Sequence, residues 1–263
     1  MTADTPVRSS LAGESLLFAG RLFTGWRRAP TVPIQALLFP TFFLITYKLV
    51  VGKSIVRITG TDSLYGLVPM CAVAGAMFGA LGAGLTIIAE RDSGLLSQLW
   101  MLPVNRASAL IGRLLAEAAR TLAGTVLITA VGVALGLRFE GGWLAMIPFV
   151  LVPVLVVLIF STAVIAIAVR SKSSALLVLL SLPSITLVFA SSGITPVQML
   201  PSWIRPLIPL QPMAPTIESM RALAQGAPAV WPLLMSLVWA LGLGAVVGPL
   251  AVRGYRAAAE SGG

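Results

Sequence analysis

Long apolar stretches separated by short polar breaks run through the chain from Thr31 to Arg253. Most are near the roughly 20 residues that a helix needs to cross the hydrocarbon layer of a bilayer. A single globular core could not bury so many apolar side chains, whereas lipid solvates them. The pattern predicts an all-helical integral membrane protein with six spans. These spans are expected at about 32–52, 64–88, 115–136, 143–169, 174–192 and 229–251.

The segments outside these spans have a different character. Residues 1–13 are polar and predict a disordered N-terminus, and 257–263 form a short C-terminal tail. Residues 14–29 mix apolar side chains, Trp26 among them, with three arginines, which predicts a helix lying in the headgroup layer. Residues 193–228 are dense in proline yet apolar throughout. This combination predicts a re-entrant hairpin before the sixth span, on the outer side.

The distribution of Lys and Arg predicts the orientation, because cytoplasmic loops carry an excess of them. With the N-terminus inside, eleven basic residues lie on the inner side and six on the outer side, and Arg120 falls within the third span. Both termini are therefore expected in the cytoplasm, as an even number of spans requires. The six outer residues are Lys48, Lys53, Arg57, Arg138, Arg205 and Arg221.

Composition narrows the classes of function. Charged residues make up only 10% of the chain, against about 25% in soluble domains. The net charge of +9 does not indicate nucleic-acid binding, because the basic residues stand singly at the ends of apolar runs, where they anchor helices. The chain has no histidine and one cysteine, Cys71, which we interpret as a packing residue. No metal site, bound cofactor or catalytic residue is predicted.

The connection after the second span carries the most specific pattern. An acidic start is followed by apolar residues at helical spacing, with Asp92 or Ser93 as a candidate N-cap and Pro103 as a stop. A short apolar helix of this kind suits docking into a groove of a partner, but it could equally lie on the membrane surface. The candidate residues are Glu90, Arg91, Asp92, Gly94, Leu95, Leu99, Trp100 and Leu102.

Arg113, Glu117 and Arg120 form a second candidate site near the cytoplasmic end of the third span. Spacings of four and three residues put them roughly on one helical face. A charge within a span is costly, so it is a functional hypothesis by default. We favour the alternative, a structural ion pair near the interface with the arginines reaching toward the headgroups, because the site is shallow.

Two further features each allow two interpretations. Gly75-x-x-x-Gly79-x-x-x-Ala83 permits close helix approach, either at a seam between two chains or, as we favour, in ordinary packing within one bundle. The outer hairpin could gate a pathway or anchor the chain at the interface. Its candidate residues are Pro201, Trp203, Arg205, Pro206, Pro209 and Pro212.

Taken with the interfacial helix and the six spans, two sequence segments resemble those of ABC-2 type permeases. They are E-R-D-S-G-L-L-S-Q-L-W-M-L-P-V-N-R after the second span and P-S-W-I-R-P-L-I-P-L-Q-P at 201–212. The resemblance covers a single transmembrane domain over 14–256 and is closest to the daunorubicin-resistance type of bacterial drug and lipid exporters.

The resemblance implies a permease in the bacterial cell membrane that pairs with a copy of itself or a related permease. It also implies a separate ATP-binding cassette subunit, which carries ATP and Mg²⁺. Residues 90–102 would form the coupling helix, and residues 14–29 would flank the same ATPase surface. The sequence agrees, because it contains no G-x-x-x-x-G-K-[ST] loop for holding phosphates.

We therefore expect a non-catalytic permease subunit that exports a hydrophobic or amphipathic substrate, such as a lipid, glycolipid or drug. An ion-coupled secondary transporter is the first alternative, and it predicts a midplane carboxylate or an inverted repeat. A membrane-embedded lipid-modifying enzyme is the second, and it predicts clustered Asp, His or Glu near one interface.

Overall fold

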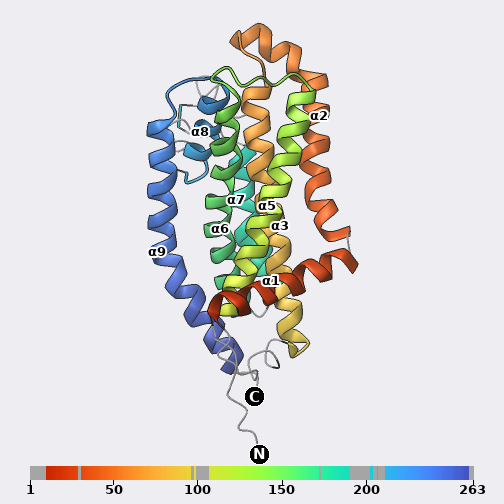
Figure 1. The fold of residues 1–263 in the computed structure, drawn as a ribbon, viewed down its shortest axis with the longest axis vertical. Coiled ribbons are helices and arrows are strands. Elements are labelled where there is room, and N and C mark those ends of the chain that lie inside the picture. Colours follow the sequence, from red (N-terminus) through yellow and green to blue (C-terminus); the bar gives the residue numbers. More distant parts are fainter. Residues whose placement is uncertain are drawn as a thin grey trace, which may run out of the picture.

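The computed structural model describes residues 10–28, 31–95, 98, 107–171, 173–189, 202–203, 206 and 211–260. Over these residues the chain is helical and contains no strand. The longer helices run side by side along the molecule, and α1 lies across one end of them (Figure 1). The elements are α1 (Leu11–Arg28), α2 (Thr31–Thr59), α3 (Leu64–Asp92), α5 (Ser108–Ala134), the 3-10 turn η1 (Trp143–Ala145), α6 (Met146–Arg170), α7 (Ser174–Phe189), α8 (Ala214–Ala224) and α9 (Val230–Glu260).

The two ends of the bundle differ in what they contain. At one end α1 crosses the bundle, α3, α6 and α9 finish, and α5 begins; we call this the α1 end (Figure 1). The short helix α8 lies at the opposite end, which we call the α8 end (Figure 1). The N-terminal helix α1 and the last turns of α9 thus lie at the same end.

Within the described part of the chain, five helices are long and apolar enough to cross a membrane. The chain is thus a multi-pass membrane protein. The predicted fifth span at 174–192 corresponds to α7, whose described part has 16 residues. At a rise of about 1.5 Å per residue it covers roughly 24 Å, short of the ~30 Å hydrocarbon layer. The prediction of six spans is therefore not confirmed. The five segments are Leu38–Arg57, Leu64–Asp92, Ser108–Ala134, Trp143–Arg170 and Val230–Gly254.

Several helices are longer than the apolar pattern predicts. The second span was expected to end at 88 and the third to begin at 115, whereas α3 continues to Asp92 and α5 begins at Ser108. The extra turns carry Glu90 and Arg113, which pair with each other. Because each charge has a partner, the helices extend past the limit that hydropathy alone suggests.

Helix α3 lies at the centre of the bundle and packs against α2, α5, α6 and α7. Small residues on α3 let these neighbours approach closely. A Cβ on Gly75 would lie 3.0 Å from Pro40 Cγ of α2, and one on Gly84 would lie 2.3 Å from Val164 Cγ1 of α6. Gly75, at the head of the Gly75–Gly79–Ala83 stripe, is therefore used for packing within the bundle, as we favoured.

Three hydrogen bonds organise the α8 end. Lys48 Nζ donates to Asp62 Oδ2 at 2.7 Å, and the backbone N–H of Leu64 donates to Asp62 Oδ1 at 2.9 Å, which fixes the turn between α2 and α3. Partial burial raises the pKa of the Asp62 carboxyl, but these hydrogen bonds outweigh it and hold the pKa below its ordinary value. The backbone N–H of Glu140 donates to the carbonyl of Ala224 at 2.9 Å, which joins the connection between α5 and η1 to the end of α8.

The predicted outer hairpin at 193–228 is described only in part. Its second half contains α8, which packs against α3, α6 and α9 with Thr216, Ile217 and Met220 fully buried. Most of its first half lies outside the described residues, so the re-entrant path is not confirmed.

Candidate functional site

One carboxylate at the α1 end joins three helices. Glu90, near the end of α3, accepts a hydrogen bond on Oε2 from Arg113 Nη2 of α5. Its other oxygen, Oε1, accepts from Arg21 Nη2 of α1 at 3.3 Å. The Glu90 and Arg113 side chains are about nine-tenths buried, while that of Arg21 is 39% exposed. Glu90 therefore fixes α1 and α5 to the last turn of α3.

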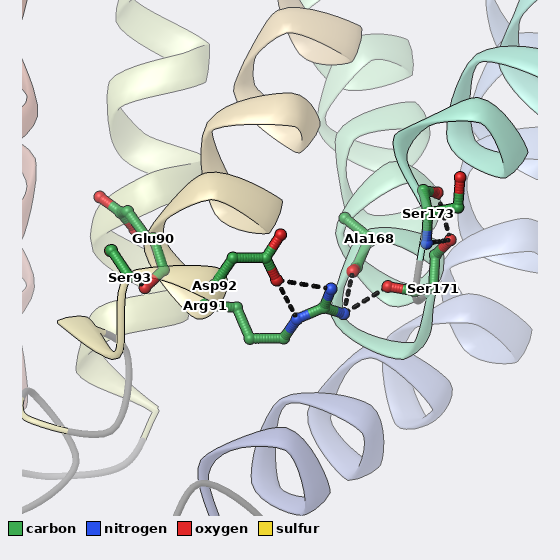
Figure 2. A network of polar contacts seen from close by, with 7 residues as sticks. All are labelled: Glu90, Arg91, Asp92, Ser93, Ala168, Ser171 and Ser173. Carbon is green, nitrogen blue, oxygen red and sulfur yellow. Dashed lines mark hydrogen bonds and ion pairs between the residues drawn. The ribbon is translucent and has the colours of Figure 1, made fainter.

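The next residue, Arg91, ties α3 to a different neighbour (Figure 2). Arg91 Nη1 donates to the backbone carbonyls of Ala168 and Ser171, at the end of α6. A cation there is favoured by the partial negative charge of a helix C-terminus. Asp92 Oδ1 accepts from Arg91 Nη2 at 2.9 Å and from Nε at 3.2 Å, which orients the guanidinium. Two consecutive side chains thus connect the end of α3 to different neighbours: Glu90 to α1 and α5, and Arg91 to α6.

The structure corrects the prediction of a helix start at Asp92 or Ser93. Asp92 is the last residue of α3, and Ser93 is its C-cap, with its backbone N–H bonded to the carbonyl of Ala89 at 3.0 Å. Gly94 follows with φ +73°, a conformation that glycine adopts at helix C-termini. Glu90, Arg91 and Asp92 therefore belong to the end of a span rather than to a new helix. A fresh turn starts after them, since Gln98 N–H donates to the Gly94 carbonyl at 3.2 Å.

The apolar part of the predicted coupling helix is largely outside the described residues. Leu95 is half-buried, whereas Leu99, Trp100 and Leu102 belong to the segment that is not described. Their amphipathic helix remains a prediction.

Glu117 and Arg120 of α5 form a pair inside the bundle. Their exposed fractions are 3% and 8%. Arg120 donates to Glu117 Oε2 from Nη2 at 2.6 Å and from Nε at 3.1 Å, and Nη2 also donates to the backbone carbonyl of Ala76 on α3 at 3.0 Å. The expectation that Arg120 reaches toward the headgroups is wrong, because its guanidinium is held against α3. Arg113 does not join this pair, since its partner is Glu90.

The absence of a side chain at Gly79 makes room for this pair. A Cβ built there would lie 1.7 Å from Arg120 Nη1 and 1.8 Å from its Cζ. Arg120 therefore occupies the volume beside Gly79 that a side chain would otherwise fill. The sequence pattern pointed to Gly79 as a small residue, but it did not indicate that an arginine from α5 fills the space.

A cavity of about 400 Å³ lies beside the pair. Side chains from α1, α2, α3 and α6 give it mainly apolar walls, and α5 contributes the row of charges expected to share one helical face. Small residues on α3 create the volume. The lining residues are Leu22, Trp26, Phe39, Phe78, Gly79, Ala80, Gly82, Ala83, Thr86, Ile87, Arg113, Glu117, Arg120, Ser161 and Ile165.

A second cavity of about 220 Å³ lies between α6 and α9 and includes Gln211, Pro212 and Met213. Gln211 is buried, and its Oε1 has no hydrogen-bond partner. Of the residues proposed for an outer gate, Pro212 lines this cavity, whereas Trp203 and Pro206 are exposed. The remaining gate candidates, Pro201, Arg205 and Pro209, lie outside the described residues.

Sequence reasoning missed one residue that pairs with Glu90 and one that lines the larger cavity. Arg21 was assigned only to the interfacial helix, yet it shares Glu90 with Arg113. Ser161 lies in a featureless apolar run of α6, yet it lines the larger cavity, and its buried Oγ has no hydrogen-bond partner. In the part of the chain that the structure describes, no three His, Cys, Asp or Glu side chains come together in a way that could hold a metal ion.

Comparison with known proteins places these features in context. Residues 53–253 match the sequence profile of the ABC-2 family transporter proteins. The chain is 35% identical over 246 residues to the probable doxorubicin resistance ABC transporter permease protein DrrC of Mycobacterium tuberculosis, an alignment that covers 93% of this chain and 89% of that protein.

Two more distant relatives are also named as transport permeases. The daunorubicin resistance ABC transporter permease protein DrrB1 of Streptomyces coeruleorubidus is 24% identical over 261 residues, which is 96% of this chain and 89% of that one. The putative transport permease ycf38 of Cyanophora paradoxa is 25% identical over 213 residues, or 80% and 73% of the two chains.

Proposed function

The chain belongs to the ABC-2 family of transporter proteins, and from this premise we propose that it is the permease subunit of an ATP-driven exporter. A separate ATP-binding cassette subunit would supply the energy, and a second permease, either another copy or a related chain, would complete the membrane unit. The cargo would be an amphipathic or hydrophobic molecule, of which the drugs named for the relatives are examples.

The arrangement of Glu90 and Arg91 is the observation that carries the coupling mechanism. The connection between α3 and α5 leaves the bundle at a point joined to α1 and α5 through Glu90 and to α6 through Arg91. A force applied to residues 90–102 would therefore reach four helices at once. We propose that the ATP-binding subunit docks on this connection and on the adjacent α1, so that ATP-driven closure tilts the bundle.

The direction of the chain through the membrane follows from the same proposal. The α1 end would face the cytoplasm, with both termini inside the cell. Helix α7 begins at the α1 end, whereas α8, the next described helix, lies at the opposite end of the bundle (Figure 1). The chain therefore changes ends between them, which supports a sixth crossing. The segment at 193–228 would then form a re-entrant hairpin at the outer surface, where it could gate release of the cargo.

A test of coupling would replace Leu99 or Trp100 with Asp in a complex with the ATP-binding subunit. A charge on the apolar docking face should reduce ATP-dependent uptake of doxorubicin into inverted membrane vesicles by roughly tenfold or more, because a desolvated charge at an interface is unfavourable. ATP hydrolysis should continue. Arg138→Asp is the control, since Arg138 is exposed in the connection between α5 and η1, outside the candidate spans and away from the docking segment.

Normal ATP-dependent uptake by the Leu99→Asp and Trp100→Asp variants would count against docking on this segment. Uptake that needs a proton gradient and no ATP would instead favour an ion-coupled secondary transporter.

Cysteine labelling tests the orientation. The single native cysteine, Cys71, is 1% exposed, so it should contribute little background. In intact cells a membrane-impermeant maleimide should label a Ser202→Cys variant and leave a Ser93→Cys variant unlabelled, although both serines are exposed in the structure. The Ser93→Cys variant should react once the cells are permeabilised. Labelling of Ser93→Cys in intact cells would reverse the proposed orientation.

A further inference from the structure

The cavity at the α1 end has the properties of a ligand site within a single permease chain. Its volume of about 400 Å³ is within the ~300–1,000 Å³ typical of sites for drug-sized molecules. Aromatic side chains from three helices line it: Trp26 of α1, Phe39 of α2 and Phe78 of α3. The rings of Phe39 and Phe78 meet edge to face, with centroids 5.5 Å apart. Such surfaces suit a flat aromatic molecule.

The exposed part of the lining shows where a ligand would come from. Phe39 is 52% exposed and Thr86 is also exposed, whereas Ser161 and Ile165 lie deep in the bundle. Exposed side chains on membrane-crossing helices face lipid, and here they stand beside the interfacial helix α1. The cavity is therefore accessible to a molecule already dissolved in the leaflet on the α1 side.

The polar groups indicate which hydrogen bonds a ligand would make. Arg113 donates to Glu90, and Arg120 donates to Glu117 and to the carbonyl of Ala76. Both bonds from Arg120 to Glu117 end on Oε2, so Arg120 does not use Oε1. The Oγ of Ser161, a residue only 1% exposed, has no partner. A buried polar atom left in this state is costly, and a hydrogen-bond donor on a ligand would remove the cost.

We propose that this cavity binds a lipid-soluble aromatic molecule of drug size that carries a hydroxyl or ammonium donor and arrives from the leaflet on the α1 side. Ser161 Oγ and Glu117 Oε1 accept hydrogen bonds from it, and Trp26, Phe39 and Phe78 contact its rings. The proposal rests on the proposed function only in identifying the bound molecule as cargo, because binding itself requires neither ATP nor a partner.

Gly82 provides a direct way to fill the cavity. It lines the cavity, and a Cβ built on it meets nothing within 4 Å. A side chain at this position therefore starts in open space at the cavity wall, and we expect the ring of a phenylalanine to occupy part of the cavity. Gly242 of α9 is the matched control, because its Cβ also meets nothing within 4 Å and it is exposed outside the cavity.

The measurement is a doxorubicin titration, followed by fluorescence, of the full-length chain in lipid nanodiscs. Gly82→Phe should raise the dissociation constant by roughly tenfold or more, and Gly242→Phe should leave it unchanged. Ser161→Ala should raise it by about threefold to tenfold through the loss of one hydrogen bond. This third variant keeps the test decisive if Gly82→Phe fails to fold.

Two results would overturn the site. One is an absence of saturable doxorubicin binding by the unmodified chain, and the other is unchanged affinity in both Gly82→Phe and Ser161→Ala. Failure of the proposed function would look different. In that case the unmodified chain and the variants would bind as expected, but the complex with the ATP-binding subunit would not export the drug.

Discussion

Replacing Glu117 with Gln should destabilise the folded chain by about 3–5 kcal/mol, the cost typical of breaking a buried ion pair by neutralising one partner. The pair is 3% and 8% exposed, and the Arg120 guanidinium is held against α3 by its hydrogen bond to the Ala76 carbonyl. In the Glu117→Gln variant the arginine would remain buried with its charge uncompensated. Thermal unfolding in detergent or nanodiscs, followed by circular dichroism, measures the effect.

Two variants separate this explanation from a general sensitivity to substitution. Combining Glu117→Gln with Arg120→Met removes both charges and should recover most of the lost stability, because a buried pair can often be replaced by apolar residues at little cost. Asp92→Asn breaks a surface pair, with the Asp92 side chain 61% exposed, and should stay within about 0.5 kcal/mol of the unmodified chain. A stability loss for Glu117→Gln no larger than that for Asp92→Asn would contradict the assignment.

Gly112→Ala should separate α1 from α5 and lower both stability and export. A Cβ at this position would lie 2.5 Å from Phe18 Cβ, 2.7 Å from the backbone oxygen of Ser15 and 3.1 Å from the backbone nitrogen of Ala19. Backbone atoms cannot move aside as a side-chain end can, so α1 itself must shift. We expect a loss of about 1–3 kcal/mol, the range for overpacking.

The matched control is Gly20→Ala on α1, where a Cβ meets nothing within 4 Å. There the same substitution should be neutral or slightly stabilising, because alanine favours helix by up to about 1 kcal/mol over glycine. Hydrogen exchange of the α1 amides reports the separation, since their protection should fall in Gly112→Ala alone. Equal protection in the two variants would show that α1 does not depend on this contact.

The helices were predictable wherever apolar length decides the outcome. The predicted span at 64–88 lies within α3, because lipid imposes a minimum length on a crossing segment. The predicted helix at 14–29 overlaps α1, which begins earlier, at Leu11, inside the stretch expected to be disordered. Their limits were less predictable at the charged ends. Glu90 and Arg113 lay outside the predicted spans at 64–88 and 115–136, yet both belong to the long helices α3 and α5, since a charge with a partner no longer needs water.

In the candidate site, contacts within one helix were predictable, whereas contacts between distant helices were not. Glu117 and Arg120 are three residues apart, so helical spacing alone placed them on one face, where they pair. The partners of Glu90 come from α1 and α5, at sequence separations of 69 and 23 residues, and no periodicity indicates such contacts. The larger cavity was not predictable either, because it depends on where Gly82 and Ala83 of α3 meet side chains from four other helices.

The sharing of Glu90 constrains how this sequence can change over evolutionary time. A neutral residue at 90 would leave two arginines, on helices far apart in the chain, without their common partner. No single compensating substitution restores the balance, since correcting one arginine leaves the other. Positions 21, 90 and 113 are therefore expected to vary together among descendants of this sequence, and an aligned set of relatives should show them changing as a group of three.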